Sequence, residues 1–340
     1  MNILDIQNLS VLFETPRGDV EAVKNLSLSI QAGETLGIVG ESGSGKSVSS
    51  LALMGLLAQN AKMFADKMKF LQHDLLKLSE SEKQNIRGSE IAMIFQDPMT
   101  SLNPCFTIGF QLMESIGVHQ KHFSKQERLK KSIELLDSVG ISEPETRMKA
   151  YPYQLSGGMS QRVMIAMALA CKPKLLIADE PTTALDVTIQ AQILDLLTTR
   201  ICDENMALIL ITHDIGIVAQ YTNRMLVMYA GQAVEEGETY SIIENPRHPY
   251  TKALLDSLPS SHSLSEHRTR LASIPGLVPD LIRRPSGCQM HLRCPYVQDH
   301  CRSEMPGMDQ HGDRRVRCFY PLNEGTPPLF EDSPSESAKE

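Results

Sequence analysis

A glycine-rich loop between a predicted strand and a predicted helix constrains this chain more than any other feature of its sequence. The segment Glu34–Gly40 is mostly apolar, as expected of a buried strand, and the run Gly40-Glu-Ser-Gly-Ser-Gly-Lys-Ser47 follows it directly. A helix is then predicted through about Ala58. Because a strand, a loop of this spacing and a helix form a phosphate-binding unit, the sequence predicts an α/β fold.

The composition of the loop indicates how phosphates would bind. Glycine tolerates backbone conformations that a side chain would block, so main-chain N–H groups can surround the phosphates. Lys46 would contact the β- and γ-phosphates, and the Ser47 hydroxyl would bind Mg²⁺ beside the positive end of the helix. By itself, the loop fits a kinase, a GTPase and an ATPase equally well. We predict that the whole loop contacts nucleotide: Gly40, Glu41, Ser42, Gly43, Ser44, Gly45, Lys46 and Ser47.

A second candidate centre follows the apolar segment Leu175–Ala178, where Asp179 and Glu180 stand side by side. The carboxyl ends of strands are where α/β folds bind ligands. Asp179 would orient Mg²⁺, and Glu180 would act as general base toward an attacking water. The alternative is a strand end that carries two solvated acids.

The remaining pattern predicts several regions. Residues 3–13 and 20–30 alternate mostly apolar and polar positions, as in two antiparallel strands. From about 97 to 157 the strand signal fades and helical spacing appears, which predicts an inserted helical subdomain. Helices and strands then alternate, which predicts a mainly parallel sheet covered by helices. The individual predictions are helices at 109–120, 124–139, 163–170 and 189–202 and strands at 174–178 and 207–212.

Composition shifts divide the chain into a first domain at 1–240, a C-terminal region at 241–323 and a tail at 324–340. The C-terminal region contains many Pro and His residues, and the tail is rich in Pro, Ser and Glu, which predicts disorder. The formal net charge of -8 argues against a nucleic-acid binder. The start of the chain lacks the pattern of a signal peptide, and its apolar stretches are shorter than the roughly 20 residues of a membrane span. We therefore expect a cytosolic protein whose membrane role, if any, depends on a partner.

The heptapeptide Leu155-Ser-Gly-Gly-Met-Ser-Gln161 narrows the class of nucleotide enzyme. Together with the phosphate loop, Gln96, the segment Leu175–Glu180 and His213, it makes the chain resemble an ABC (ATP-binding cassette) ATPase over roughly residues 3–240. The resemblance implies an ABC-type P-loop ATPase core with an antiparallel N-terminal β subdomain and an inserted helical subdomain. A small irregular C-terminal region with four cysteines would follow.

The same resemblance implies roles for single residues. Gln96 would contact Mg²⁺ and water, and His213 would sense the γ-phosphate. Asp186, in Ala184-Leu-Asp186, would contact a second cassette. Phe13 stands where the family often stacks an aromatic ring on adenine, although a phenylalanine in an alternating strand fits the core equally well.

Ser156, Gly157 and Gly158 are predicted to begin a helix and to bind the γ-phosphate of ATP on a second cassette. The full site would thus need two subunits. Met159 replaces the glutamine most often found at this position of the family's motif, and a thioether cannot make the hydrogen bonds of glutamine. The alternative is a capped helix whose glycines serve packing.

A closer resemblance is to the ATPase subunits of bacterial dipeptide and oligopeptide importers. It is carried by the segments Ile94–Pro104, Glu180–Gln190, His248–Leu255 and Ile274–Gly276. It implies a peripheral subunit on the cytoplasmic face of the cell membrane, with a paralogous second cassette, two permease subunits and an extracytoplasmic peptide-binding protein. The surface near 97–118 would contact the permease. Alternatives are another small solute as cargo, or a soluble cassette protein of DNA repair or ribosome rescue.

Four of the seven cysteines gather near the end of the chain: Cys288, Cys294, Cys301 and Cys318. In some members of the importer family four such cysteines hold a [4Fe–4S] cluster. Four thiolates suit this cluster or structural zinc, and free thiols are a third possibility. Cys105, Cys171 and Cys202 are expected to be inert.

Overall fold

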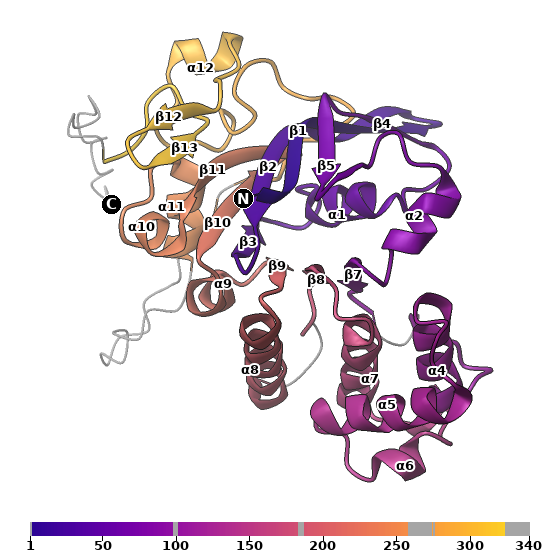
Figure 1. Cartoon of the computed structure of the whole chain (residues 1–340). Helices are drawn as coiled ribbons and strands as arrows, with labels where there is room; N and C mark the ends of the chain where they lie inside the picture. Colours follow the sequence, from indigo (N-terminus) through magenta and orange to yellow (C-terminus); the bar gives the residue numbers. More distant parts are fainter. Residues whose placement is uncertain (1, 98–100, 183–186, 258–273, 275, 324–340) are drawn as a thin grey trace, which may run out of the picture.

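The computed structural model describes residues 2–97, 101–182, 187–257, 274 and 276–323. Its centre is an eight-stranded sheet in the order β12-β13-β11-β10-β3-β9-β8-β7 (Figure 1). Strands β10, β3, β9, β8 and β7 pair in parallel, so the predicted mainly parallel sheet is confirmed. The parallel strands are β3 (Thr35–Val39), β7 (Ile91–Ile94), β8 (Leu175–Asp179), β9 (Ala207–Thr212) and β10 (Arg224–Tyr229).

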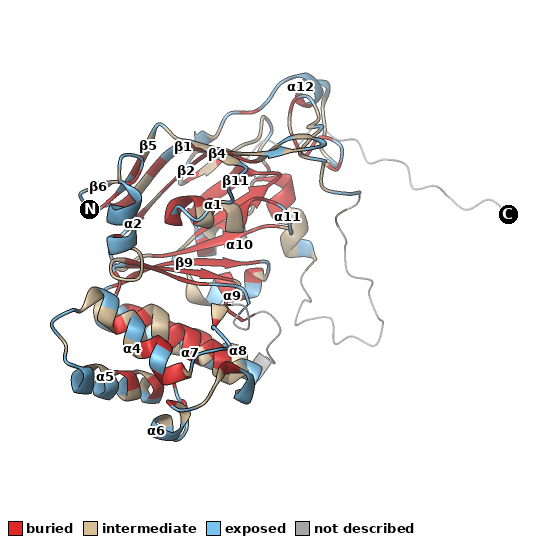
Figure 2. Cartoon of the chain, turned by 90° about the vertical axis from the view of Figure 1, so that its right-hand side faces the viewer, coloured by how far each residue is buried: buried red, intermediate tan, exposed pale blue. Residues whose placement is uncertain are grey.

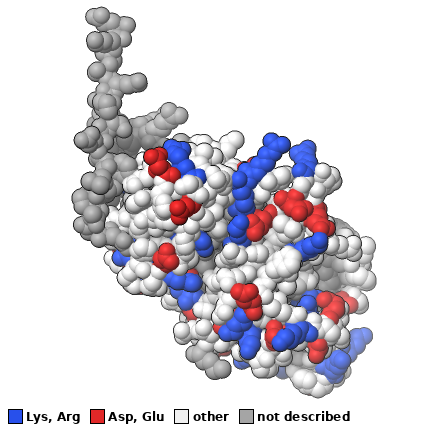
Figure 3. All heavy atoms as spheres, turned by 90° about the horizontal axis from the view of Figure 1, so that it is seen from above, with Lys and Arg blue, Asp and Glu red and all other residues white. Residues whose placement is uncertain are grey.

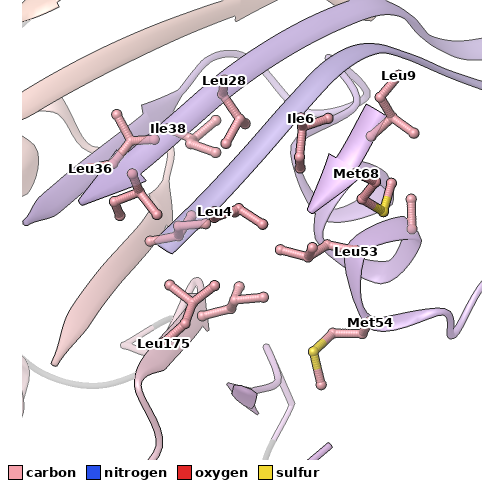
Figure 4. Packing of buried hydrophobic residues seen from close by; sticks show 14 of the residues in the cluster. Leu4, Ile6, Leu9, Leu28, Leu36, Ile38, Leu53, Met54, Met68 and Leu175 are labelled. Carbon is pink, nitrogen blue, oxygen red and sulfur yellow. The ribbon is translucent and has the colours of Figure 1, made fainter. Parts of the chain in front are cut away.

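An antiparallel sheet forms the N-terminal layer. The two strands predicted there are confirmed, although each is longer than predicted, and they pair as an antiparallel hairpin. Its apolar face and helix α1 enclose one apolar core with the central sheet (Figure 4). The strands are β1 (Asn2–Thr15), β2 (Gly18–Gln31), β4 (Ala61–Phe64), β5 (Lys67–Phe70) and β6 (His73–Asp74), and helix α2 (Glu80–Ile86) follows them.

Helix α1 (Lys46–Met54) is shorter than predicted. Gly55 adopts a left-handed φ of 63° and its N–H bonds back to the last turn, which ends the helix before the predicted Ala58. Helix α7 (Gly157–Leu169) begins at the glycines that were predicted to begin a helix, ahead of the apolar segment predicted as helical at 163–170. The Ser156 side chain accepts a hydrogen bond from the Met159 N–H and caps it.

The inserted helices pack together below the sheet and share a second apolar core with its lower face (Figure 2). Their amphipathic spacing was visible in the sequence, and a capping box at Ser124 fixes the start of one of them. The group comprises α4 (Ile108–His119), α5 (Lys125–Ser138), α6 (Pro144–Arg147), the 3₁₀ turn η1 (Pro152–Gln154), α7 and, beyond β8, α8 (Val187–Glu204).

The C-terminal region joins the central sheet. Strand β11 (Gln232–Glu238) pairs with β13 (Arg314–Val316), which pairs with β12 (Asp309–His311). Strands of the C-terminal region thus extend the sheet of the first predicted domain, and the domain boundary at residue 240 stays a prediction. The predicted tail at 324–340 lies outside the described residues. Helices α9 (Ile215–Tyr221), α10 (Thr239–Glu244), α11 (Pro249–Asp256) and α12 (Asp299–Ser303) complete the fold.

The view from above shows Lys and Arg side chains interspersed with Asp and Glu on that face (Figure 3). No basic stripe is visible there. Among the described residues, none of the helices combines the length and apolarity that crossing a membrane requires.

Candidate active site

The phosphate loop follows β3 and leads into α1, as predicted. Two of its glycines are required by their surroundings. Gly40 has a φ of 155°, and a Cβ there would overlap the main-chain oxygen of Met228. Gly45 has a φ of 96°, and a Cβ there would overlap the main-chain oxygen of Ala22. The loop therefore keeps its shape only with glycine at both positions.

Two polar side chains lie inside the loop. The Lys46 ammonium donates hydrogen bonds to the main-chain oxygens of Gly40 (2.7 Å) and Glu41 (3.0 Å). Burial lowers the pKa of Lys46, while the carboxylates of Glu180 and Asp179 oppose this shift. The Ser44 hydroxyl is buried and finds no hydrogen-bond partner among the described residues. A cradle with a buried cation and an unsatisfied hydroxyl fits a phosphate group.

Two of the three residues predicted to hold Mg²⁺ lie together, Ser47 at the start of α1 and Asp179 at the end of β8, whereas the third, Gln96, contacts Glu180. The Ser47 hydroxyl donates to Oδ1 of Asp179 at 3.0 Å, and Asp179 is only 5% exposed. Burial raises the pKa of Asp179, and the hydrogen bond from Ser47 opposes this shift. A hydroxyl and a carboxylate are the hard oxygen ligands that Mg²⁺ prefers, so the residues present fit this ion.

Glu180 is the meeting point of the predicted catalytic residues. Gln96, just beyond β7, donates to Oε2 of Glu180 at 2.9 Å, and Nδ1 of His213, just beyond β9, lies 3.3 Å from Oε1. Glu180 has a φ of 47°, a left-handed conformation that is strained for a residue other than glycine. The three side chains thus converge from the ends of three neighbouring strands.

The heptapeptide lies in the helical subdomain at the start of α7. Ser156 and Gly157 are exposed, and a Cβ added at Gly157 would meet no atom within 4 Å. At Gly158, an added Cβ would make only an ordinary contact of 3.5 Å with Ile189. Neither glycine is needed for packing against the residues that the structure describes.

The roles of two further residues, Phe13 and Asp186, stay predictions. Phe13 is half-buried and packs against the first apolar core, so its stacking on adenine stays a prediction. Asp186 lies outside the described residues. The Met159 side chain packs against the second apolar core, which explains why an apolar residue is tolerated there.

Comparison with known proteins identifies the family. Residues 23–183 match the ABC transporter family, and residues 234–301 match the oligopeptide/dipeptide transporter C-terminal region. The dipeptide transport ATP-binding protein DppD of Escherichia coli is 54% identical over 97% of this chain and 100% of its own length. The chain belongs to the ABC transporter family.

Two other members of the family support this assignment. The oligopeptide transport ATP-binding protein OppD of Salmonella typhimurium is 49% identical over 95% of each chain. Among solved structures, a dimeric post-hydrolysis state of the ATP-binding cassette MJ0796, bound to ADP and Pi, matches with a TM-score of 0.60 and 28% identity. It covers 69% of this chain and 98% of its own. The predicted ABC-type core is thereby confirmed.

The four C-terminal cysteines of this ABC protein line one pocket, which we call the thiol pocket: Cys288, Cys294, Cys301 and Cys318. All four are free thiols. Burial raises the pKa of Cys294 to about 11 and that of Cys318 to about 12, and nearby cysteines add to both shifts. Over the described part of the chain, no group of three or more His, Cys, Asp or Glu side chains is placed to hold a metal ion.

Two residues that contact the phosphate loop of this ABC protein were not predicted from its sequence. Arg293 and Tyr250, both from the C-terminal region, hydrogen-bond to Glu41. Tyr250 falls within a segment that carries the family resemblance, but neither residue stands in a nucleotide-binding motif. Only the chain's long-range folding brings them to the loop.

Proposed function

We propose that this chain is the ATP-hydrolysing subunit of an importer for dipeptides and oligopeptides. The convergence of Gln96 and His213 on Glu180 beside the phosphate loop carries this proposal. The relatives named for dipeptide and oligopeptide transport match almost the whole chain, including its C-terminal region, and support the choice of cargo.

In the proposed reaction, Glu180 accepts a proton from water as the water oxygen attacks the γ-phosphorus of ATP, and the bond to the β-phosphate oxygen breaks. Gln96 and His213 hold the two carboxylate oxygens of Glu180 in position. Lys46 would exchange its main-chain partners for phosphate oxygens. Ser47 and Asp179 would hold Mg²⁺, which neutralises phosphate charge when bound.

Replacing the proposed base tests this function. Glu180→Gln keeps the size of the side chain and removes its basicity, so steady ATP turnover should fall by about 10²–10⁴-fold while ATP binding persists. Asp195→Asn, on the distant helix α8, is a matched control and should leave turnover unchanged. Near-normal turnover of the Glu180→Gln variant would refute the assigned base.

We also infer that two cassettes form the complete site. Ser156 and Gly157 are exposed at the positive end of helix α7, where main-chain N–H groups can bind a phosphate. Because no packing against the described part of the chain requires the glycines, a ligand on a second subunit is the better explanation of their presence. The solved relative MJ0796 is described as a dimer. A paralogous partner is part of this proposal.

The proposed contact with the permease lies on the helical subdomain. Phe95, Phe106, Phe110 and Val118 are between 37% and 55% exposed, which is unusual for side chains so apolar. The rings of Phe106 and Phe110 stack at 4.6 Å between centroids. We propose that membrane-spanning permease subunits cover this surface and hold the chain at the cytoplasmic face of the membrane. Phe110→Asp should lower recovery of the complex with its permease, and equal recovery would exclude this surface.

For the thiol pocket we propose a [4Fe–4S] cluster. All four cysteines line one pocket, and four thiolates fit a [4Fe–4S] cluster. Four thiolates would also fit structural zinc, and the resemblance to the importer family favours the cluster. The cluster would connect segments that have little regular structure.

Metal analysis of the full chain, purified without oxygen, tests the cluster. We expect about four irons and four sulfides per chain, with an absorbance that is lost in Cys294→Ser. Cys202→Ser, an exposed cysteine outside the pocket, should keep both. Stoichiometric zinc, or neither metal, would refute the cluster without touching the ATPase assignment.

A further inference from the structure

Glu41, the second residue of the phosphate loop, is held at three points. Its carboxylate accepts two hydrogen bonds from Arg293, at 3.0 and 3.1 Å. Its N–H donates to the Tyr250 hydroxyl at 2.9 Å, and its main-chain oxygen accepts from Lys46 at 3.0 Å. Two of these three contacts come from the C-terminal region, more than 200 residues away along the chain.

Arg293 is fixed before it reaches the loop. It is 7% exposed, and its main-chain N–H donates to the oxygen of Met290 at 2.8 Å within the turn that carries Cys288 and Cys294. Its guanidinium lies 5.7 Å from the ring centroid of Tyr229 and 3.4 Å from the hydroxyl of that residue. A guanidinium with so little freedom loses little entropy when it binds a carboxylate through two bonds.

Two tyrosines, Tyr229 and Tyr250, support the contact between Arg293 and Glu41. Tyr229 and Tyr250 are both buried, and their ring centroids are 4.6 Å apart. Burial raises the pKa of both hydroxyls, so they remain protonated donors and acceptors at neutral pH. The Tyr250 hydroxyl is therefore a fixed acceptor for the Glu41 N–H.

Other arginines of the C-terminal region have a different kind of partner. Arg314 and Arg315 contact Glu235 and Glu236, which are buried on strand β11. Those pairs connect β13 to the sheet and lie within the scaffold. Glu41, in contrast, is 26% exposed in its side chain and belongs to the loop whose shape determines phosphate binding. The Arg293 contact is therefore directed at the site.

We propose that Arg293 is a positioning residue for ATP binding, which acts through Glu41 with the support of Tyr250. The pair holds the first turn of the phosphate loop, so the C-terminal region sets the loop geometry that ATP meets. This inference rests on the proposed function, because it requires the loop to bind ATP.

A double-mutant cycle in the full chain separates positioning from a general loss of structure. Binding of Mg·ATP is measured for the wild type, Arg293→Gln, Glu41→Gln and the double variant. Arg293→Gln should weaken binding about tenfold, because a charge-assisted two-bond contact is lost. In the Glu41→Gln background the same change should have less than about a twofold effect. The affinities are measured at about 0.15 M salt, which screens the long-range attraction between the Arg293 guanidinium and the phosphates. A loss of affinity then reports the contact with Glu41.

Three further variants complete the test. Arg315→Gln makes the same side-chain change elsewhere in the C-terminal region and should leave ATP affinity unchanged. Arg293→Lys keeps the charge but not the two-bond geometry, so it should restore affinity only in part. Tyr250→Phe removes one oxygen, is the variant of choice if Arg293→Gln does not fold, and should weaken ATP binding by several-fold.

Two outcomes would overturn the inference if the wild type binds Mg·ATP. In one, Arg293→Gln weakens Mg·ATP binding equally in the wild-type and Glu41→Gln backgrounds. In the other, neither Arg293→Gln nor Tyr250→Phe changes the affinity for Mg·ATP. A wild-type chain that does not bind Mg·ATP would instead overturn the proposed function.

Discussion

Two helix starts bind phosphate in the proposed function, and they differ in how much of the site this chain supplies. At α1 the loop is enclosed: Gly40 and Gly45 fit against main-chain oxygens, and Lys46 is buried among its own loop's carbonyl groups. At α7 the start is open, with Ser156 and Gly157 exposed and free space beside the glycine. The chain itself folds one half of the proposed site, and in the proposed function a second subunit completes the other half.

The largest expected effect comes from alanine at the enclosed start. Gly40→Ala should lower the free energy of unfolding by about 4 kcal/mol or more and abolish ATP binding, because the added methyl overlaps the main-chain oxygen of Met228 and strains a φ of 155°. Thermal or denaturant unfolding measures this. Gly157→Ala is the matched variant at the open start and should stay within about 0.5 kcal/mol of the wild type. Similar losses in both variants would refute the comparison.

A charge at the open start should separate hydrolysis from binding. Gly157→Asp places a carboxylate where the partner's γ-phosphate would lie, so ATPase activity of the assembled transporter should fall by about 100-fold. ATP affinity of the single subunit should not change, and Gly157→Ala should lower the activity less than Gly157→Asp, because its methyl group adds bulk beside the phosphate but no charge. Loss of ATP affinity in the isolated Gly157→Asp subunit would show that the two starts are not independent.

In the enclosed half of the site, the buried carboxylate of Asp179 should lower the stability of the folded protein in a pH-dependent way. Burial raises the pKa of this carboxyl, so its favourable contribution to stability is present only below its unfolded pKa and is lost as the pH rises through the folded value. Asp179→Asn should therefore melt at a higher temperature than the wild type at pH 7 without nucleotide. The difference should shrink as the pH falls toward about 4.

Melting curves across this pH range are the measurement, with Asp19→Asn, at an exposed position near the start of strand β2, as control. In the presence of Mg·ATP the order should reverse, because the variant loses a ligand of the ion. An Asp179→Asn variant less stable than the wild type at pH 7 would show that the buried charge is not the dominant cost.

The smallest effect is expected at Met159. Its side chain packs against the second apolar core, while its N–H donates a hydrogen bond to the capping hydroxyl of Ser156. Met159→Gln should thus cost about 1 kcal/mol of stability and change ATPase activity by less than about twofold. A large gain in activity would mean that this side chain takes part in the shared site.

Much of the fold and about half of the site could be predicted from local sequence. The phosphate loop, the capped helices and the strands of the covered sheet were predicted because neighbouring residues set backbone conformation and burial pattern. The segments 61–94 and 224–238, in contrast, were not assigned, although they form β4, β5, β7, β10 and β11. Their apolar runs are short, and β4, β5, β7 and β10 pair with strands distant in the sequence.

The sequence by itself determined the chemistry: which residues are predicted to bind phosphate, which carboxylates stand at a strand end and which helix starts with glycines. Tertiary structure decided the connections. The Gln96 and His213 contacts with Glu180 depend on the order β9-β8-β7, and the Arg293 contact with Glu41 spans 252 positions and depends on the C-terminal region folding against the central sheet. Local sequence cannot specify such contacts, because they depend on how whole strands pair.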